Sequence, residues 1–198
     1  SGPVFATGII SFNLVENAWN QIPTGGEAVG PLMTDSANWN HNTVPTTGDY
    51  ANGTLTGLVD YYGAATGVDV EWASSNTWWV GGVTNDEERL QAGYLDDGGE
   101  GVLVTFTNIP YTDYKVYGLF SSDYAPDGIV NTMVNGEWVL GGDATSTAAA
   151  YRTFQENFTA NAENWTEIIR GQVAGNYWTI GTTGDTLVID SEARNSGF

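Results

Sequence analysis

The chain alternates between short segments rich in β-branched and aromatic residues and turns rich in Gly, Asn and Asp, and no other feature constrains its fold as much. Segments of this kind are typical of β-strands, whereas an amphipathic helix needs a longer stretch with apolar residues at a 3.6-residue period. This criterion predicts about a dozen strands. They lie at residues 9–14, 55–60, 68–72, 78–80, 102–106, 114–120, 129–134, 137–140, 152–158, 165–169, 177–180 and 186–190.

Two local patterns support the strand prediction. Residues 68–72, Val-Asp-Val-Glu-Trp, place the apolar side chains on one face of an extended segment and both carboxylates on the other. Asn135-Gly136 stands between two predicted strands and is a dipeptide favoured in two-residue hairpin turns. The chain therefore contains at least one tight antiparallel hairpin.

Helical signals are few. Residues 85–92 can form two turns, with Asn85 as the N-cap, Glu88 at the capping-box position and Gly93 as the stop. Residues 144–152 are a weaker candidate.

The length and the strand pattern together predict the fold class. A chain of 198 residues without a linker-like stretch fits one large all-β domain. We expect an all-β fold, a two-sheet antiparallel jelly-roll-like sandwich with one or two short helices. The sandwich is expected to span residues 9–198, preceded by an extended N-terminal segment at residues 1–8.

Composition excludes several classes of function. Five Lys and Arg stand against 24 Asp and Glu, giving a net charge of −19, which makes nucleic acids and anionic membranes poor partners. The chain has no Cys and one histidine, His41, so thiolate chemistry and a His-rich metal centre are excluded. No apolar run is long enough for a membrane helix. We identify no catalytic residue and do not expect an enzyme, although paired carboxylates for sugar hydrolysis stay open among so many acids.

The aromatic residues suggest carbohydrate binding as one function. An exposed Trp or Tyr ring can stack on the apolar face of a sugar without needing a charge. If the pairs Trp78-Trp79 and Tyr61-Tyr62 lie on strands, one member of each faces the core and the other faces outward. The alternative is that the aromatic rings fill the space between two sheets. The candidate glycan-binding residues are Trp19, Trp39, Tyr62, Trp78 and Trp79.

Acidic turns suggest a calcium site. Ca²⁺ takes six to eight oxygen ligands from carboxylates and loop carbonyls, and the turns around residues 96–100 and 121–128 supply both. No stretch has EF-hand spacing, so a site would combine separate loops. Solvated turn acids are the alternative, and residues 85–88 form a third acidic run. The candidate Ca²⁺ ligands are Asp96, Asp97, Glu100, Asp123 and Asp127.

An ordered set of short motifs gives a resemblance over nearly the whole chain. The motifs are Ile10-Ser11-Phe12-Asn13, Asn38-Trp39-Asn40, Leu58-Val59-Asp60 with Gly63-Ala64, Gly93-Tyr94-Leu95-Asp96, Tyr114-Lys115-Val116-Tyr117 and Val134-Asn135-Gly136. In this order they resemble a β-sandwich domain of large secreted bacterial surface proteins, which often sits beside autotransporter-type repeats. That domain is similar in outline to jelly-roll carbohydrate-binding modules. The resemblance implies a non-catalytic module that is extracellular or on the cell surface.

One departure from the resemblance leads to the main functional hypothesis. In the family pattern an apolar strand follows the final Ser-Gly-Phe, whereas this sequence ends at Phe198. We expect a sandwich that borrows the missing strand from another copy, which gives a filament or tube unless the contact closes on itself. The alternative is that the last strand was lost by trimming of the sequence. The candidate donor residues are Pro3, Val4, Phe5, Ala6 and Thr7.

Three functions therefore stand as hypotheses. The first is a structural subunit that polymerises with copies of itself, stabilised by calcium at its acidic turns because cations offset repulsion between subunits. The second is a carbohydrate-binding module that uses exposed Trp and Tyr, with a polysaccharide as partner. The third, a glycan hydrolase or lyase, has no visible site.

Overall fold

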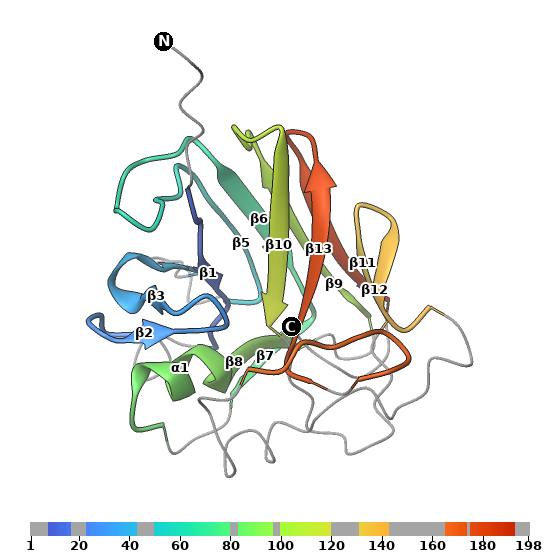
Figure 1. Cartoon of the computed structure of the whole chain (residues 1–198), viewed down its shortest axis with the longest axis horizontal. Coiled ribbons are helices and arrows are strands. Elements are labelled where there is room, and N and C mark those ends of the chain that lie inside the picture. The colour runs from blue at the N-terminus through green and yellow to red at the C-terminus, as the bar shows by residue number, and fades with distance from the viewer. Residues whose placement is uncertain are drawn as a thin grey trace.

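The computed structural model of the chain describes residues 8–16, 23–42, 50–79, 83–96, 100–119, 131–142, 165–173 and 175–192. These residues form an all-β structure with one α-helix, α1 (Asp86–Ala92), and one 3-10 turn, η1 (Ser36–Asn38). Its sheets lie in two layers (Figure 1). The predicted class, an all-β sandwich with one or two short helices, is therefore confirmed.

A six-stranded antiparallel sheet forms the back layer. Each neighbouring pair of its strands is antiparallel, as expected for strands joined by hairpins and longer sandwich connections. In spatial order its strands are β12 (Glu137–Leu140), β11 (Asn131–Val134), β14 (Leu187–Glu192), β9 (Val102–Thr107), β6 (Asp69–Ala73) and β5 (Asn52–Leu55).

The front layer consists of smaller sheets. β10 (Asp113–Leu119) pairs antiparallel with β13 (Tyr177–Thr183) along its whole length, in front of the back sheet (Figure 1). β1 (Phe12–Asn13) pairs in parallel with β4 (Asn40–His41). Two further antiparallel pairs are β2 (Ala28–Val29) with β3 (Thr34–Asp35), and β7 (Asn76–Trp79) with β8 (Gly93–Asp96).

The clearest local predictions are confirmed. Val70 and Trp72 on β6 are buried, with Val68 just ahead of them, and the alternate Glu71 is exposed. The β11–β12 hairpin turns at Asn135 and Gly136, whose φ values of 49° and 83° are the positive values that a two-residue hairpin turn requires.

Helix α1 also begins and ends as predicted. The Asn85 side chain accepts a hydrogen bond from the Glu88 backbone N–H at 2.8 Å. Glu88 reaches back to the N–H of Thr84, one residue before the expected capping-box partner. β8 begins directly at Gly93, a strand that the sequence patterns did not predict.

Two predicted strands differ from the observed elements. Of the strand predicted at residues 55–60, only Leu55 lies in a strand, as the last residue of β5. The chain turns soon afterwards at Gly57, which has a φ of 67°. Residues 165–169 form isolated bridges, Glu167 with Tyr177 and Ile169 with Val173, rather than a strand. The predicted helix at 144–152 and strand at 152–158 lie outside the described residues.

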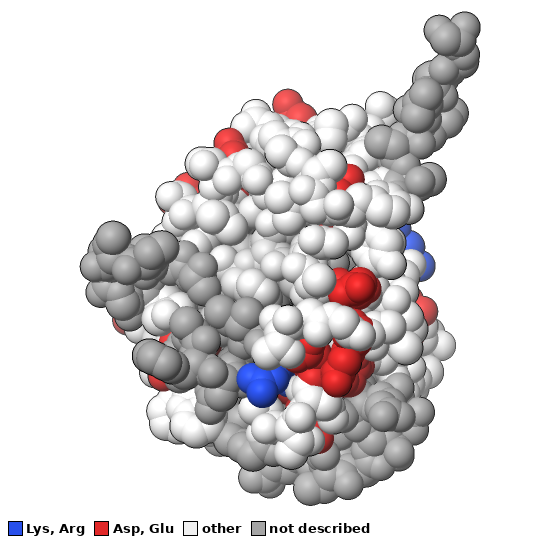
Figure 2. Space-filling model, turned by 90° about the vertical axis from the view of Figure 1, so that its left-hand side faces the viewer, with Lys and Arg blue, Asp and Glu red and all other residues white. Residues whose placement is uncertain are grey.

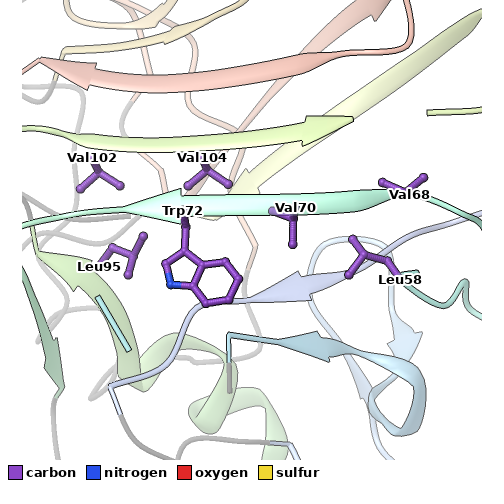
Figure 3. Packing of buried hydrophobic residues seen from close by; sticks show 7 residues of the cluster. All are labelled: Leu58, Val68, Val70, Trp72, Leu95, Val102 and Val104. Atoms are coloured by element: carbon purple, nitrogen blue, oxygen red, sulfur yellow. The ribbon is translucent and has the colours of Figure 1, made fainter. Parts of the chain in front are cut away.

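The hydrophobic core consists of two clusters. One lies under β1 and contains Leu58, Val68, Val70, Trp72, Leu95, Val102 and Val104 (Figure 3). In Figure 3, Trp72 and Val70 point from β6 to the same side, and Leu95 lies beside the indole. The other lies under β10 and β13 and contains Val134, Val139, Leu140, Ile168, Trp178 and Leu187.

Candidate functional site

An apolar groove lies in the front layer between residues 8–14 and β10. Its volume is about 490 Å³, and both flanking segments contribute to its walls. Its floor is the inner face of the back sheet, where Val104, Phe106 and Ile189 come from β9 and β14. The groove therefore lies where one more strand would complete the front layer.

The groove separates the two core clusters. Phe106, Ile109 and Ile189 pack against both clusters, yet each stays only partly buried. Each square ångström of apolar surface removed from water stabilises by roughly 25 cal/mol. An apolar strand in the groove would thus cover these side chains and join the two clusters into one core.

One side of the groove is an unpaired strand edge formed by residues 9–14. The carbonyls of Ile9, Ser11 and Asn13 accept hydrogen bonds from the N–H groups of Tyr61, Asn40 and Asn42, all on the side away from the groove. Backbone groups of successive residues in an extended segment point to opposite sides. Those of Ile10, Phe12 and Leu14 therefore point into the groove, and no described residue pairs with them.

The other side of the groove is the free edge of β10. Every residue from Asp113 to Leu119 is in register with β13, which occupies one edge of the strand. Within the described part of the chain, no strand pairs with the opposite edge. The groove is therefore bordered by two rows of unpaired backbone N–H and C=O groups, which another extended segment can satisfy.

Two buried polar atoms beside the groove have no hydrogen-bond partner among the residues that the structure describes. They are Nε1 of Trp178, a residue only 1% exposed, and Oη of Tyr114, and both residues line the groove. Burial and the nearby Asp185 carboxylate raise the pKa of Tyr114, which keeps its hydroxyl protonated. Both groups are hydrogen-bond donors, and leaving a buried donor unpaired costs free energy.

The groove is almost free of charge. Of the residues that line it, only Lys115 is charged, although the chain carries 24 acids. The Lys115 ammonium lies 5.0 Å from the centre of the Tyr117 ring. A ligand for this groove should therefore be apolar and uncharged.

The acidic side chains that the structure describes near α1 serve the fold. Asp86 is 2% exposed and accepts hydrogen bonds from the N–H groups of Thr24 and Gly25 and from the Ser36 hydroxyl, at 2.7–2.9 Å. Burial alone would raise the pKa of Asp86, but these hydrogen bonds outweigh it and lower the pKa. Figure 2 shows acidic side chains gathered on the face that carries α1, β2 and β3.

Two of the five predicted calcium ligands are described, Asp96 at the end of β8 and Glu100 just before β9. Asp97, Asp123 and Asp127 lie outside the described residues, so the calcium site stays a prediction. Among the residues that the structure describes, no three carboxylate or imidazole groups form a cluster able to hold a metal ion.

The predicted aromatic residues that the structure describes lie in a turn, on β7 and in the groove. Tyr62 is 75% exposed in a turn, while Trp78 and Trp79 are 52% and 40% exposed on β7. The expectation that one of the two tryptophans faces the core is wrong, because both side chains are exposed on β7, which among the described residues pairs with β8 alone. Trp39 instead lines the groove, with its Nε1 donating to Thr34 Oγ1 at 3.1 Å. Trp19 lies outside the described residues.

The predicted donor residues, 3–7, also lie outside the described residues. They precede Gly8, which lies at one end of the groove. A missing strand implies an open groove, but the place of the groove was not predicted from any local pattern, because its two sides come from segments far apart in the sequence. The signal that could indicate it is the apolar, uncharged run from Ile9 to Leu14, interrupted by small polar residues.

Comparisons with known proteins give no relative. The chain matches no protein-family model, no curated protein and no solved structure. In the described part of the chain, no helix has the length and apolar character to cross a bilayer.

Proposed function

We propose that the protein is a non-catalytic structural subunit that self-assembles by accepting an extended strand from another copy. The observation that carries this proposal is the groove with an unpaired strand edge on each side and a divided core beneath it. β-strand addition fits such a site, because main-chain hydrogen bonds provide affinity and apolar pockets take alternate side chains. An extracellular or surface location and calcium stabilisation belong to the same proposal.

Residues 3–7 suit the groove as the donated strand. The segment Pro-Val-Phe-Ala-Thr is apolar at its centre, and the first fifteen residues carry no charged side chain. Inserting it therefore brings no acid into the groove, despite a net charge of −19 on each chain. Folding the same segment back within one chain would use at least two residues for the turn. Donation between copies leaves all of residues 3–7 free to pair.

A charge placed in the donor tests the proposal. Phe5→Asp puts a carboxylate into a groove whose lining is uncharged apart from Lys115, where the carboxylate would lose its hydration, and we expect this variant to be monomeric. Ser1→Asp makes the same change in net charge outside the donor segment and should assemble like the unaltered protein. Light scattering and electron microscopy measure the assembly. Particles of unchanged size for Phe5→Asp, or a monomeric unaltered protein, would contradict strand donation.

Carbohydrate binding is the second candidate, favoured by the exposure of Trp78 and Tyr62. It would be supported by a monomeric protein that binds a soluble polysaccharide in affinity gels and loses that binding on Trp78→Ala. A protein that assembles and binds no polysaccharide would remove this candidate.

A further inference from the structure

The two segments that flank the groove run in the same direction. A Cβ atom added to Gly8 would lie 1.9 Å from Tyr111 Oη, so the start of residues 8–14 abuts the chain just ahead of β10. In Figure 1 both segments run from this end toward α1. A strand inserted between them is thus antiparallel to both or parallel to both.

The two ends of the groove are not equivalent. The far end, beyond Leu14, is lined by the turn after β2, with Gly30, Pro31 and Leu32, and by Leu90 of α1. Glu87 ties this turn to the helix by accepting from the Gly30 N–H at 2.9 Å. At the near end the contact across the groove is between Gly8 and the tip of the Tyr111 side chain, which can turn aside more easily than the backbone turn and the helix at the far end. The connection from an inserted strand to its own domain therefore leaves most readily at the near end.

On this basis we infer that residues 3–7 of a second copy insert antiparallel to both flanking segments, with Thr7 at the near end. The inference rests on the proposed strand donation. Antiparallel pairing also has the straighter and slightly stronger hydrogen bonds. All strand pairs of the described residues except β1 with β4 are antiparallel.

This polarity makes the exchange reciprocal. In the donor, Gly8 directly follows Thr7 and lies at the near end of the donor's own groove. The near end of the donor's groove therefore faces the near end of the acceptor's groove. The acceptor's residues 3–7 leave at that same end, toward the donor's groove. A two-fold axis perpendicular to the strands relates the two copies, and each fills the groove of the other. Such an isologous contact closes as a dimer, whereas parallel insertion would place the copies head to tail in an open filament.

Cross-linking and mass together test the inference. Because the chain lacks Cys, introduced pairs report one contact each. With a short bismaleimide linker, Pro3→Cys with Leu119→Cys should join two copies, because in the antiparallel arrangement with Thr7 opposite Asp113 residue 3 lies about two residues, roughly 7 Å, from Leu119. Thr7→Cys with Leu119→Cys is the matched control. It should not link, since Thr7 then lies about six residues, roughly 20 Å, from Leu119.

The outcomes separate the two proposals. A particle of twice the chain mass, linked through residue 3, is the result expected for reciprocal exchange. Filaments, or linkage through residue 7, would keep strand donation and overturn the antiparallel polarity. A protein that stays monomeric at every concentration and links through neither pair would overturn strand donation itself, and the polarity with it.

Discussion

His41 on β4 has a half-buried ring, and its Nδ1 has no hydrogen-bond partner among the described residues. Burial lowers its pKa from 6.5 to about 4, because the charged imidazolium would lose its hydration. In the folded protein the ring therefore stays neutral well below the pH at which the unfolded chain takes up a proton.

This difference in pKa predicts a pH-dependent stability. Between pH 6.5 and about 4 the unfolded state binds the proton and the folded state does not, so stability falls as the pH falls through this window. The slope contributed by one proton is at most about 1.4 kcal/mol per pH unit. Urea unfolding at about pH 7 and pH 5 should show a smaller loss for His41→Gln than for the unaltered protein. Equal losses would show that His41 does not titrate in this way.

Among the elements, the β10–β13 pair depends on a glycine. Gly118 lies opposite Trp178, and a Cβ atom at Gly118 would stand 2.0 Å from Trp178 Cζ2, so the indole covers the bare backbone of β10. Gly53 and Trp72 repeat this arrangement between β5 and β6, where a Cβ atom at Gly53 would lie 2.6 Å from Trp72 Cζ2. In both sheets a buried tryptophan packs on a glycine of the neighbouring strand.

Gly118→Ala should therefore destabilise the fold. The ring or the strand must move to admit the methyl group, and overpacking of this kind costs about 1–3 kcal/mol. Gly181→Ala is the matched control on β13, because a Cβ atom there meets nothing within 4 Å. The midpoint of urea unfolding should fall for Gly118→Ala and change little for Gly181→Ala. A similar midpoint for both variants would mean that the indole adapts without cost.

What could be predicted from the sequence was local. The caps of α1, the Asn-Gly hairpin and the alternation on β6 each depend on residues within a few positions of one another. The strand predicted at 55–60 failed because Gly57 ends β5 early, and β8 was missed because it follows α1 without a connecting turn. The groove depends on contacts between distant segments, such as Phe12 with Phe106, whose rings lie 5.8 Å apart, and no local pattern reports these.

At the scale of the whole molecule, charge opposes the assembly that the groove favours. Each chain carries −19, and two copies that exchanged strands would bring two bodies of like charge close together. The uncharged groove and donor mean that this repulsion acts between the bodies of the subunits rather than at the paired strands. Salt screens such repulsion, with a Debye length of about 30 Å at 0.01 M and about 8 Å at 0.15 M.

Association between copies should therefore become tighter as the salt concentration rises, in contrast to a contact held by ion pairs. Light scattering over a dilution series in low and physiological NaCl measures this, with Phe5→Asp as the monomeric control.

Adding Ca²⁺ at matched ionic strength separates charge screening from binding of the ion at a specific site. A further gain with Ca²⁺ but not with Mg²⁺, reversed by a chelator, is expected if the acidic turns bind calcium between subunits. An equal effect of both cations would leave screening as the whole cause, and dissociation on adding NaCl would contradict the uncharged contact proposed for the groove.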